Sequence, residues 1–258
     1  MKHALLLWLL DALLRKPAGV LVLDTHAGVG AYDLSSSEAL RTGEHHGGIA
    51  RLIDHPPLVL QPYVSLVTRL GLYPGSPTLI RAQLRPQDRL ACCELHPEDA
   101  ATLRARFSRD QLVSVHERDA WEALGALLPP AQLKRALVLI DPPYEAADEF
   151  TRVSQGLIRG LSRCRFGVFA AWYPVKHRAP VREFHRVLRE SGTRDIVTAE
   201  LWLRAPLDAS RLNGCGLVVI NPPFGFEDAA RGLLAALLSR LGHGEHGEGF
   251  AVERLVDE

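Results

Sequence analysis

The sequence predicts an α/β protein with a doubly wound, mainly parallel sheet. Three observations support this fold class: buried apolar runs alternate with helix-like segments, several runs end in an acidic residue, and a glycine-rich turn follows the first run. In open sheets of this kind, ligands bind outside the carboxyl ends of the strands. The acidic strand ends therefore mark the edge at which we expect a binding site.

Composition and charge limit the possible functions. The chain has 258 residues, of which 47% are hydrophobic and 23% charged, as expected for a globular enzyme with one domain over residues 1–258. The net charge is zero, so any nucleic-acid site must be a local basic patch. The cysteines match no zinc or redox spacing, and we expect buried thiols in a cytoplasmic protein without a metal: Cys92, Cys93, Cys164 and Cys215.

The first segment, residues 2–16, is predicted to form a buried helix that ends at Pro17. Its run from Ala4 to Leu10 resembles the core of a signal peptide, but Asp11 interrupts the run and no small-residue cleavage site follows. The run is also too short to span a membrane. We therefore favour the buried helix and expect no membrane association.

A glycine-rich turn follows the first predicted strand, residues 20–23. The strand ends in Asp24, and the turn contains Gly28 and Gly30, which let a cofactor approach the backbone closely. The next strand begins only near Arg89, too far away for a simple crossover helix. The intervening stretch is therefore predicted to be a small helical insertion over 31–86, with helices over 62–71 and from Ser76 or Pro77.

The doubly wound pattern resumes after the insertion. The predicted elements are strands over 89–93, 112–115, 137–140 and 166–172, helices over 97–107, 121–128, 150–163, 180–192 and 227–241, and an antiparallel pair over 194–203 and 212–220. The tail over 242–249 is predicted to be a loop.

Acidic residues follow four successive strands at Asp24, Glu94, Asp119 and Asp141. Glu94, after the second strand, is placed to accept hydrogen bonds from both ribose hydroxyls of a nucleoside-like cofactor, and Asp119 from an adenine amino group. Each acid alone is equally well explained as a helix N-cap or a surface residue. Four such residues around one glycine-rich turn favour a cofactor site.

The most informative stretch is the central strand 137–140 with the residues that follow it, Asp141, Pro142, Pro143 and Tyr144. The two prolines end the strand and stiffen the turn, which fixes a carboxylate at the open edge of the sheet. This geometry suits methyl transfer to an exocyclic amino group. Asp141 and a turn carbonyl, that of Pro142, would accept the two N–H groups of an adenine. Tyr144 would stack on the base, a contact worth roughly 1–3 kcal/mol.

A second candidate motif, Asn221-Pro222-Pro223-Phe224, also follows a buried strand and would be catalytic in a permuted enzyme. The glycine-rich turn lies in the first half of the chain, however, and three acid-ended strands lead from it to Asp141. This order leaves Asn221 on a later strand, away from the cofactor. We therefore assign the catalytic role to Asp141, against the alternative of an ordinary strand end.

With these features assembled, the chain resembles the RlmJ-type 23S rRNA (adenine-N6)-methyltransferases over nearly its whole length. The motifs that carry the resemblance are residues 23–30, 41–44, 73–77, 94–97, 140–144, 172–175 and 220–223. The resemblance implies a Rossmann-like fold with a small helical insertion, S-adenosylmethionine as cofactor, and protein-free 23S rRNA as substrate. A monomer is expected.

The resemblance also implies individual site residues. Cofactor contacts fall on His3, His26, Ser76, Glu94, Asp119, Ala120 and Asp141, and Gly28 joins them from the glycine-rich turn. Asp141 is the implied catalytic acceptor, and Lys2 and Tyr144 are candidate substrate contacts. The family usually has glycine where this chain has Ala120, a change that a backbone contact would survive.

The family carries a Tyr-Arg-His…Phe-His-Ala-Gly-Asn segment before its Lys-His pair, whereas here Met1 directly precedes Lys2-His3. In the family this segment helps to close the cofactor pocket and meets the RNA. The expectation is therefore that the native start lies upstream or that activity is impaired, and that restoring the segment strengthens cofactor or RNA binding.

Three functions remain open at this stage. The first is RNA adenine-N6 methylation, with a local basic patch drawn from Arg159, Arg163, Arg165, Lys176, His177, Arg178 and Arg182. The second is DNA adenine methylation, which uses the same motif but usually adds a target-recognition domain that is not visible here. The third is a non-catalytic RNA-binding or scaffold role.

Overall fold

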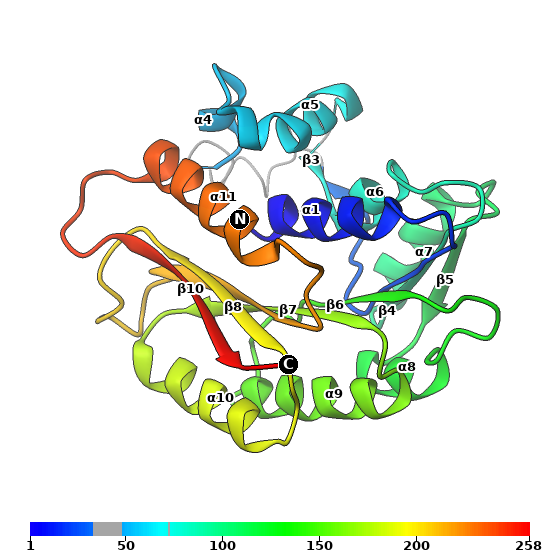
Figure 1. Ribbon diagram of the computed structural model, residues 1–258. Helices are drawn as coiled ribbons and strands as arrows, with labels where there is room; N and C mark the ends of the chain where they lie inside the picture. Colours follow the sequence, from blue (N-terminus) through cyan, green and yellow to red (C-terminus); the bar gives the residue numbers. More distant parts are fainter. Residues whose placement is uncertain (33–47, 72) are drawn as a thin grey trace.

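The computed structural model describes residues 1–32, 48–71 and 73–258. Its centre is an eight-stranded sheet in the order β10-β8-β9-β7-β6-β1-β4-β5 (Figure 1). The strands are β1 (Leu21–Asp24), β4 (Arg89–Glu94), β5 (Val113–Glu117), β6 (Ala136–Ile140), β7 (Val168–Val175), β8 (Ile196–Trp202), β9 (Gly214–Ile220) and β10 (Gly249–Val256). The strands from β5 to β7 are parallel, whereas β9 runs antiparallel to both β7 and β8. This architecture confirms the predicted α/β fold class.

Helices cover both faces of the sheet (Figure 1). One face is covered by α8 (Ala120–Ala126), α9 (Glu149–Arg163) and α10 (Arg178–Glu190), whose apolar sides share one core cluster with the strands. The other face carries α1 (Lys2–Leu14), α5 (Gln61–Leu70), α6 (Ser76–Arg81), α7 (Pro97–Arg106) and α11 (Phe226–Leu241). Two hydrophobic cores therefore sandwich the sheet, as expected when crossover helices alternate between faces.

The first helix is apolar around most of its circumference because it is enclosed on several sides. Leu5, Leu6, Leu9 and Leu10 have no solvent exposure. The helix packs on α11, α5 and α6, and the Trp8 and Phe226 rings lie 5.7 Å apart. The predicted buried helix is thus confirmed. In the described part of the chain, no helix is long and apolar enough to cross a bilayer.

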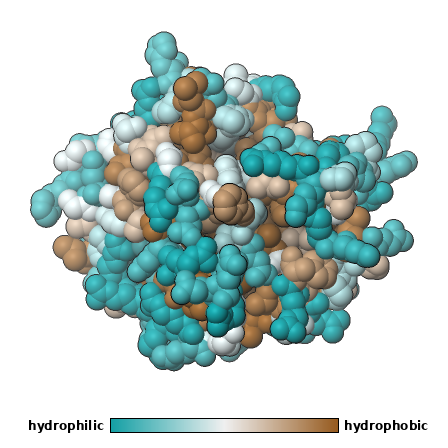
Figure 2. Space-filling view, in the orientation of Figure 1, coloured by the Kyte–Doolittle hydropathy of each residue, from teal (hydrophilic) through white to brown (hydrophobic). Residues whose placement is uncertain are grey.

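The predicted insertion over 31–86 is partly described, and its motif at 41–44 lies outside the described residues. The described part contains α4 (Ala50–Ile53), a 3-10 turn at Leu58–Leu60, α5, α6 and the short strands β2 (Ala31–Tyr32) and β3 (Tyr73–Pro74). The helices predicted over 62–71 and from Ser76 are confirmed. Figure 2 shows apolar side chains over this segment, where Leu58 is 81% exposed, on an otherwise largely hydrophilic face. That the insertion forms a separate unit stays a prediction.

The strand β10 was not predicted from the sequence. It pairs antiparallel with β8 at the edge of the sheet, and Leu255 is its buried residue. Most of its residues are only half-buried and two of them, Glu253 and Arg254, are charged, so its hydrophobic pattern is weak. The cysteines are all free, with Cys92, Cys93 and Cys164 buried and Cys215 only partly so.

Candidate active site

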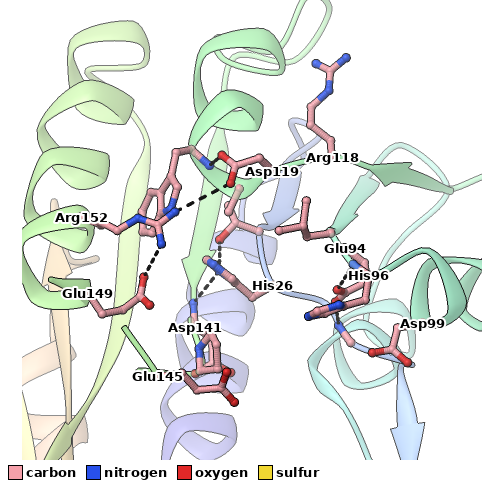
Figure 3. Close-up of a pocket in the computed structure, with 16 residues that line it drawn as sticks. His26, Glu94, His96, Asp99, Arg118, Asp119, Asp141, Glu145, Glu149 and Arg152 are labelled. Carbon is pink, nitrogen blue, oxygen red and sulfur yellow. Dashed lines mark hydrogen bonds and ion pairs between the residues drawn. The ribbon is translucent and has the colours of Figure 1, made fainter. Parts of the chain in front are cut away.

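A cavity of about 360 Å³ opens at the carboxyl ends of β1, β4, β5 and β6 (Figure 3). It lies at the edge that the acidic strand ends predicted, and it is large enough for a small-molecule ligand. The lining residues come from four strand ends, the loops after them and three helix starts: Thr25, His26, Gly28, Glu94, Leu95, His96, Asp99, Arg118, Asp119, Ala120, Trp121, Asp141, Pro143, Glu145, Glu149 and Arg152. Six of the predicted site residues, His26, Gly28, Glu94, Asp119, Ala120 and Asp141, therefore converge on one cavity.

Glu94 holds two loops of the cavity together. Its Oε2 accepts the backbone N–H of Gly28 at 2.9 Å, and its Oε1 accepts that of His96 at 2.9 Å. Gly28 adopts the left-handed conformation, with φ of 59°, that favours glycine. The carboxylate is only 8% exposed and is fixed between the first and second strands of the parallel half.

Asp119 is both a cavity residue and a helix cap. Its Oδ1 accepts the N–H groups of Trp121 at 2.8 Å and Glu122 at 3.1 Å, which caps α8. Its Oδ2 lies 4.0 Å from the Arg152 guanidinium at the cavity wall. The capping role that the sequence left open is therefore present, and one carboxylate oxygen still faces the cavity side.

Asp141 follows β6 and is surrounded by charged and polar groups. Lys2 forms an ion pair with its Oδ2, so the start of α1 is tied to the end of the central strand. Its backbone N–H donates to Nδ1 of His26 at 3.3 Å, and the Thr25 hydroxyl lies 2.8 Å from the same nitrogen. Burial lowers the pKa of His26 to about 4, so its ring is neutral near pH 7 and can accept this hydrogen bond.

Tyr144 lies on the turn behind the cavity. It has a left-handed φ of 56°, and its hydroxyl donates to the carbonyl oxygen of Trp172 at 2.8 Å. The Tyr144 ring packs edge-on against Phe150 and Trp172, at 5.1 and 5.8 Å between centroids. Neither Tyr144 nor the buried Pro142 lines the cavity itself. Their predicted roles in catalysis and substrate binding stay predictions.

Three further residues, the predicted His3 and Ser76 and the acidic Asp24, do not line the cavity itself. His3 is partly buried, with its ring 6.5 Å from that of Tyr63, and its buried Nε2 has no hydrogen-bond partner among the described residues. Asp24 is fully buried with its Oδ2 equally unpaired. Burial raises the pKa of Asp24 to about 6, an effect that the nearby Ser76 side chain opposes. Buried polar atoms without partners are uncommon and indicate that a further group completes the site.

Sequence reasoning missed one wall of the cavity. Arg152, from the first turn of α9, lies over the Trp121 ring at 5.4 Å and 3.6 Å from the Glu149 carboxylate (Figure 3). Trp121 in turn meets the edge of His26 at 5.7 Å. The sequence signal was weak, because an arginine and a tryptophan in two helices look like surface and core residues until the helices pack.

The charge of the cavity fits the predicted cofactor. Six carboxylates line it against two guanidinium groups: Glu94, Asp99, Asp119, Asp141, Glu145 and Glu149 against Arg118 and Arg152. S-adenosylmethionine carries a sulfonium and an ammonium group beside one carboxylate, and a cavity of negative charge favours such a cation. The residues present therefore fit this cofactor.

The second motif lies at the other end of the strands, opposite to the end that forms the cavity. Because β9 is antiparallel to β7, its last residue Ile220 pairs with Phe169 near the start of β7. Asn221 donates to the carbonyl oxygens of Arg165 and Gly167 at 3.0 and 2.8 Å, a structural role that leaves it far from Asp141. Its predicted exclusion from the catalytic role is consistent with this position.

The basic residues proposed from the sequence do not form one patch. One group follows the carboxyl end of β7: Lys176, His177, Arg178 and Arg182. The other group, Arg159 and Arg163, lies along α9, which runs toward the opposite ends of the strands, where Arg165 lies near Asn221. A 15-residue helix spans about 22 Å, which separates the two groups. The single patch expected from the sequence was therefore wrong.

Comparison with known proteins identifies the family. The family model described as "Ribosomal RNA large subunit methyltransferase D, RlmJ" matches residues 17–253. The chain is 38% identical over 249 residues to "Ribosomal RNA large subunit methyltransferase J" of Escherichia coli, covering 93% of this chain and 89% of that protein. The chain belongs to the RlmJ family. The protein of the same name from Haemophilus influenzae is 38% identical over 250 residues, with the same shares covered.

A solved structure supports the fold of this RlmJ-family chain. The crystal structure of a Legionella pneumophila protein superposes with a TM-score of 0.89 and 34% sequence identity, covering 98% of this chain and 95% of that one. The resemblance inferred from the motifs is thus confirmed at the level of family and fold. The roles of individual site residues in this RlmJ-family member are proposals that rest on the geometry above.

Proposed function

We propose that the chain transfers a methyl group from S-adenosylmethionine to the exocyclic N6 amino group of an adenine in 23S rRNA. The observation that carries the proposal is the position of Asp141. It ends the central strand, it lines a cavity of negative charge, and it is followed by a stiff Pro-Pro turn. Family membership supports the rRNA substrate, since the named relatives are large-subunit rRNA methyltransferases.

The chain's own residues would prepare the amino group for attack. The adenine amino nitrogen is a poor nucleophile because its lone pair is delocalised into the ring. Asp141 would accept one N–H and the Pro142 carbonyl the other, which favours a tetrahedral nitrogen with a localised lone pair. The Lys2 ammonium pairs with Oδ2 and positions the carboxylate, and Asp141 would accept the proton that the nitrogen releases after transfer.

Around the cavity, Gly28, Glu94, Asp119 and Ala120 would hold the nucleoside half of the cofactor, with Glu94 accepting from the ribose hydroxyls. His3, His26 and Ser76 would hold its amino-acid half near the unpaired Oδ2 of Asp24. When bound, the cofactor supplies an electrophilic methyl group on a sulfonium. The neutral ring of His26 adds no positive charge beside that cation.

The target base must leave its stack to reach Asp141. Loops and single strands of protein-free 23S rRNA present such bases more readily than a duplex does. Tyr144 would meet the base on the substrate side, held by its bond to the Trp172 carbonyl. A monomer suffices, because all of these residues come from one chain. DNA methylation and a non-catalytic role are the outcomes that the following test separates.

The direct test is incorporation of labelled methyl groups. Protein-free 23S rRNA, assembled large subunits and single-stranded DNA of matched length are offered to the enzyme with radiolabelled S-adenosylmethionine. We expect N6-methyladenine in the free rRNA after nuclease digestion and mass spectrometry. Label confined to the DNA, or cofactor binding by calorimetry without transfer to any nucleic acid, would refute the proposal.

Replacing Glu94 should weaken cofactor binding. Glu94→Ala removes the acceptor for the ribose hydroxyls and leaves them unpaired, which costs about 1–3 kcal/mol, roughly 5- to 150-fold in affinity measured by calorimetry. Glu94→Gln keeps an acceptor oxygen and should lose less. Glu117→Ala is the matched control, because Glu117 pairs in register with Glu94 on β5 but is exposed. Equal affinities for all three variants would contradict the assignment.

Asp24→Asn should stabilise the fold in a pH-dependent way. The pKa of Asp24 is raised to about 6 in the folded state from 3.8. Its favourable contribution to the free energy of unfolding is therefore complete below about pH 3.8 and is lost as the pH rises through 6. At pH 8 the amide removes a buried charge, a gain of about 1–3 kcal/mol, or roughly 2–8 °C in Tm. Calorimetric scans at pH 4 and 8 check this, with the exposed Asp11→Asn as control. A gain at pH 4 equal to that at pH 8 would contradict it.

A further inference from the structure

The strand β7 extends beyond the catalytic edge. Ile140 at the end of β6 pairs with Ala171, so Asp141 is level with Trp172 and residues 173–175 continue past it. At about 3.3 Å per residue, these three residues rise roughly 10 Å above Asp141. Gly214 on β9 pairs with both Val175 on β7 and Trp202 on β8, so the three strands reach the same level.

Two connections sit on top of these strands and form one surface, which we call the ledge: residues 176–178 after β7 and residues 203–213 between β8 and β9. Both leave the sheet at the same end (Figure 1). Because neighbouring strands lie about 4.8 Å apart, the two connections begin within roughly 10 Å of each other. The ledge therefore flanks the cavity on the side of Asp141 where the substrate must enter.

The ledge is fixed by Asn213, which is 2% exposed. Its Nδ2 donates to the carbonyl oxygens of Lys176 at 2.6 Å and Asp208 at 2.8 Å, so one side chain ties both connections together. Its backbone N–H donates to Val175 at 3.1 Å, and its carbonyl oxygen accepts from Leu203 at 2.9 Å. The surface is thus held in place before any partner binds.

The charge of the ledge is opposite to that of the cavity. Its sequence contains Lys176, Arg178, Arg204 and Arg211 against the single acid Asp208, although Arg178 and Arg204 pair with Glu200 and Glu245 outside the ledge. Lys176 and Arg211 are exposed. Asp208 is engaged by the N–H and hydroxyl of Ser210, at 2.9 and 2.6 Å.

Two further features suit a nucleic acid. The Arg178 guanidinium lies over the Trp202 ring at 4.1 Å and donates to Glu200 at 2.7 Å, which fixes a cation at the inner end of the ledge. Leu207 and Leu212 are 77% and 54% exposed among the cations. Phosphates pair with Lys and Arg, and unstacked bases lie on apolar side chains, so cations interleaved with apolar groups match a single-stranded RNA.

We propose that the ledge binds the nucleotides that flank the target adenine, with Lys176 and Arg211 on the phosphates and Leu212 beneath a base. This inference rests on the proposed rRNA methylation and names its RNA-docking surface. The rise of roughly 10 Å corresponds to about three stacked nucleotides. With a net charge of zero for the whole chain, a local surface of this kind is what an RNA substrate requires.

The test is the double variant Lys176→Ala/Arg211→Ala, measured by fluorescence anisotropy on a protein-free 23S rRNA fragment over a series of salt concentrations. We expect roughly tenfold weaker RNA binding and a shallower salt dependence, by about 0.7 per lost phosphate contact. Cofactor affinity and Tm should match wild type, because both side chains are exposed. The control is Arg165→Ala/Arg194→Ala, which removes two cations near Asn221 at the opposite edge.

The outcomes separate the ledge from the reaction. RNA affinity and salt slope equal to wild type in the ledge variant would overturn the proposal, as would an equal loss in the control variant. If the wild-type chain binds RNA through the ledge but methylates none, the proposed function fails while the docking surface stands. If an acidic protein bound the ledge more tightly than the RNA fragment and displaced it, the assignment of the ledge to RNA would also be overturned.

Discussion

Asp141→Asn is expected to reduce the rate of methyl transfer by about 10²–10³, the largest functional effect of any single substitution proposed for this chain. The amide keeps the shape of the side chain and one acceptor oxygen, but it loses the negative charge. In the proposed mechanism, that charge would stabilise the positive charge developing on the adenine nitrogen and would receive its proton. Losses of a preorganised electrostatic contact of this kind cost roughly 3–4 kcal/mol. Single-turnover transfer to protein-free 23S rRNA measures the effect.

The control for this experiment is Asn221→Ala in the second Pro-Pro motif. It should leave the single-turnover rate nearly unchanged, because Asn221 bonds backbone carbonyls at the opposite edge of the sheet. Melting temperatures measured alongside separate a loss of chemistry from a loss of folding. Wild-type rates for Asp141→Asn together with an inactive but folded Asn221→Ala would mean that the two motifs exchange roles.

Gly216→Ala is expected to cause the largest loss of stability, about 3–5 kcal/mol. A Cβ on Gly216 would lie 2.2 Å from Cζ and 2.5 Å from the hydroxyl oxygen of Tyr173, whose ring is fully buried. The ring cannot move without overpacking its neighbours, at about 1–3 kcal/mol. It would also break the hydroxyl's bond to Glu200 at 2.9 Å and its contact with His185 at 3.0 Å, leaving buried polar groups unpaired.

Denaturant unfolding of Gly216→Ala beside Gly232→Ala checks this expectation. Gly232 lies inside α11, and a Cβ there would meet nothing within 4 Å. Alanine should therefore stabilise that helix by roughly 0.5–1 kcal/mol. If the two variants unfolded at the same denaturant concentration, the inference that Gly216 packs too tightly against Tyr173 to accept a Cβ would be wrong.

The parts of this site that the sequence predicted are those that each strand specifies locally. An apolar run ending in Glu94 or Asp141 fixes a carboxylate at the edge of the sheet whatever its neighbours do, because the carboxyl ends of parallel strands meet there. The glycine-rich turn is equally local, since the backbone at Gly28 requires a residue without a side chain.

The parts that were missed depend on how separate elements pack. Arg152 stacks on Trp121 only because α9 lies beside α8, and neither residue signals this in its own helix. Lys2 meets Asp141 across 139 residues of sequence. The arginines of α9 joined Lys176 in one predicted patch because they are close in sequence, although the helix between them crosses the molecule. The edge strand β10 was missed because its mostly half-buried side chains give no clear alternation of apolar and polar residues.

The enclosure of α1 has a consequence for synthesis on the ribosome. This helix is made before α11, the partner that brings Phe226 against Trp8 and that lies more than 200 residues later in the chain. At about 5–20 residues per second, roughly 10–40 s pass between the two. During that time the leucines of the nascent helix lack their final cover, so the growing chain presents an apolar segment that chaperones recognise. Lys2 and His3, at the start of this helix, take their final places only after α11 has been made.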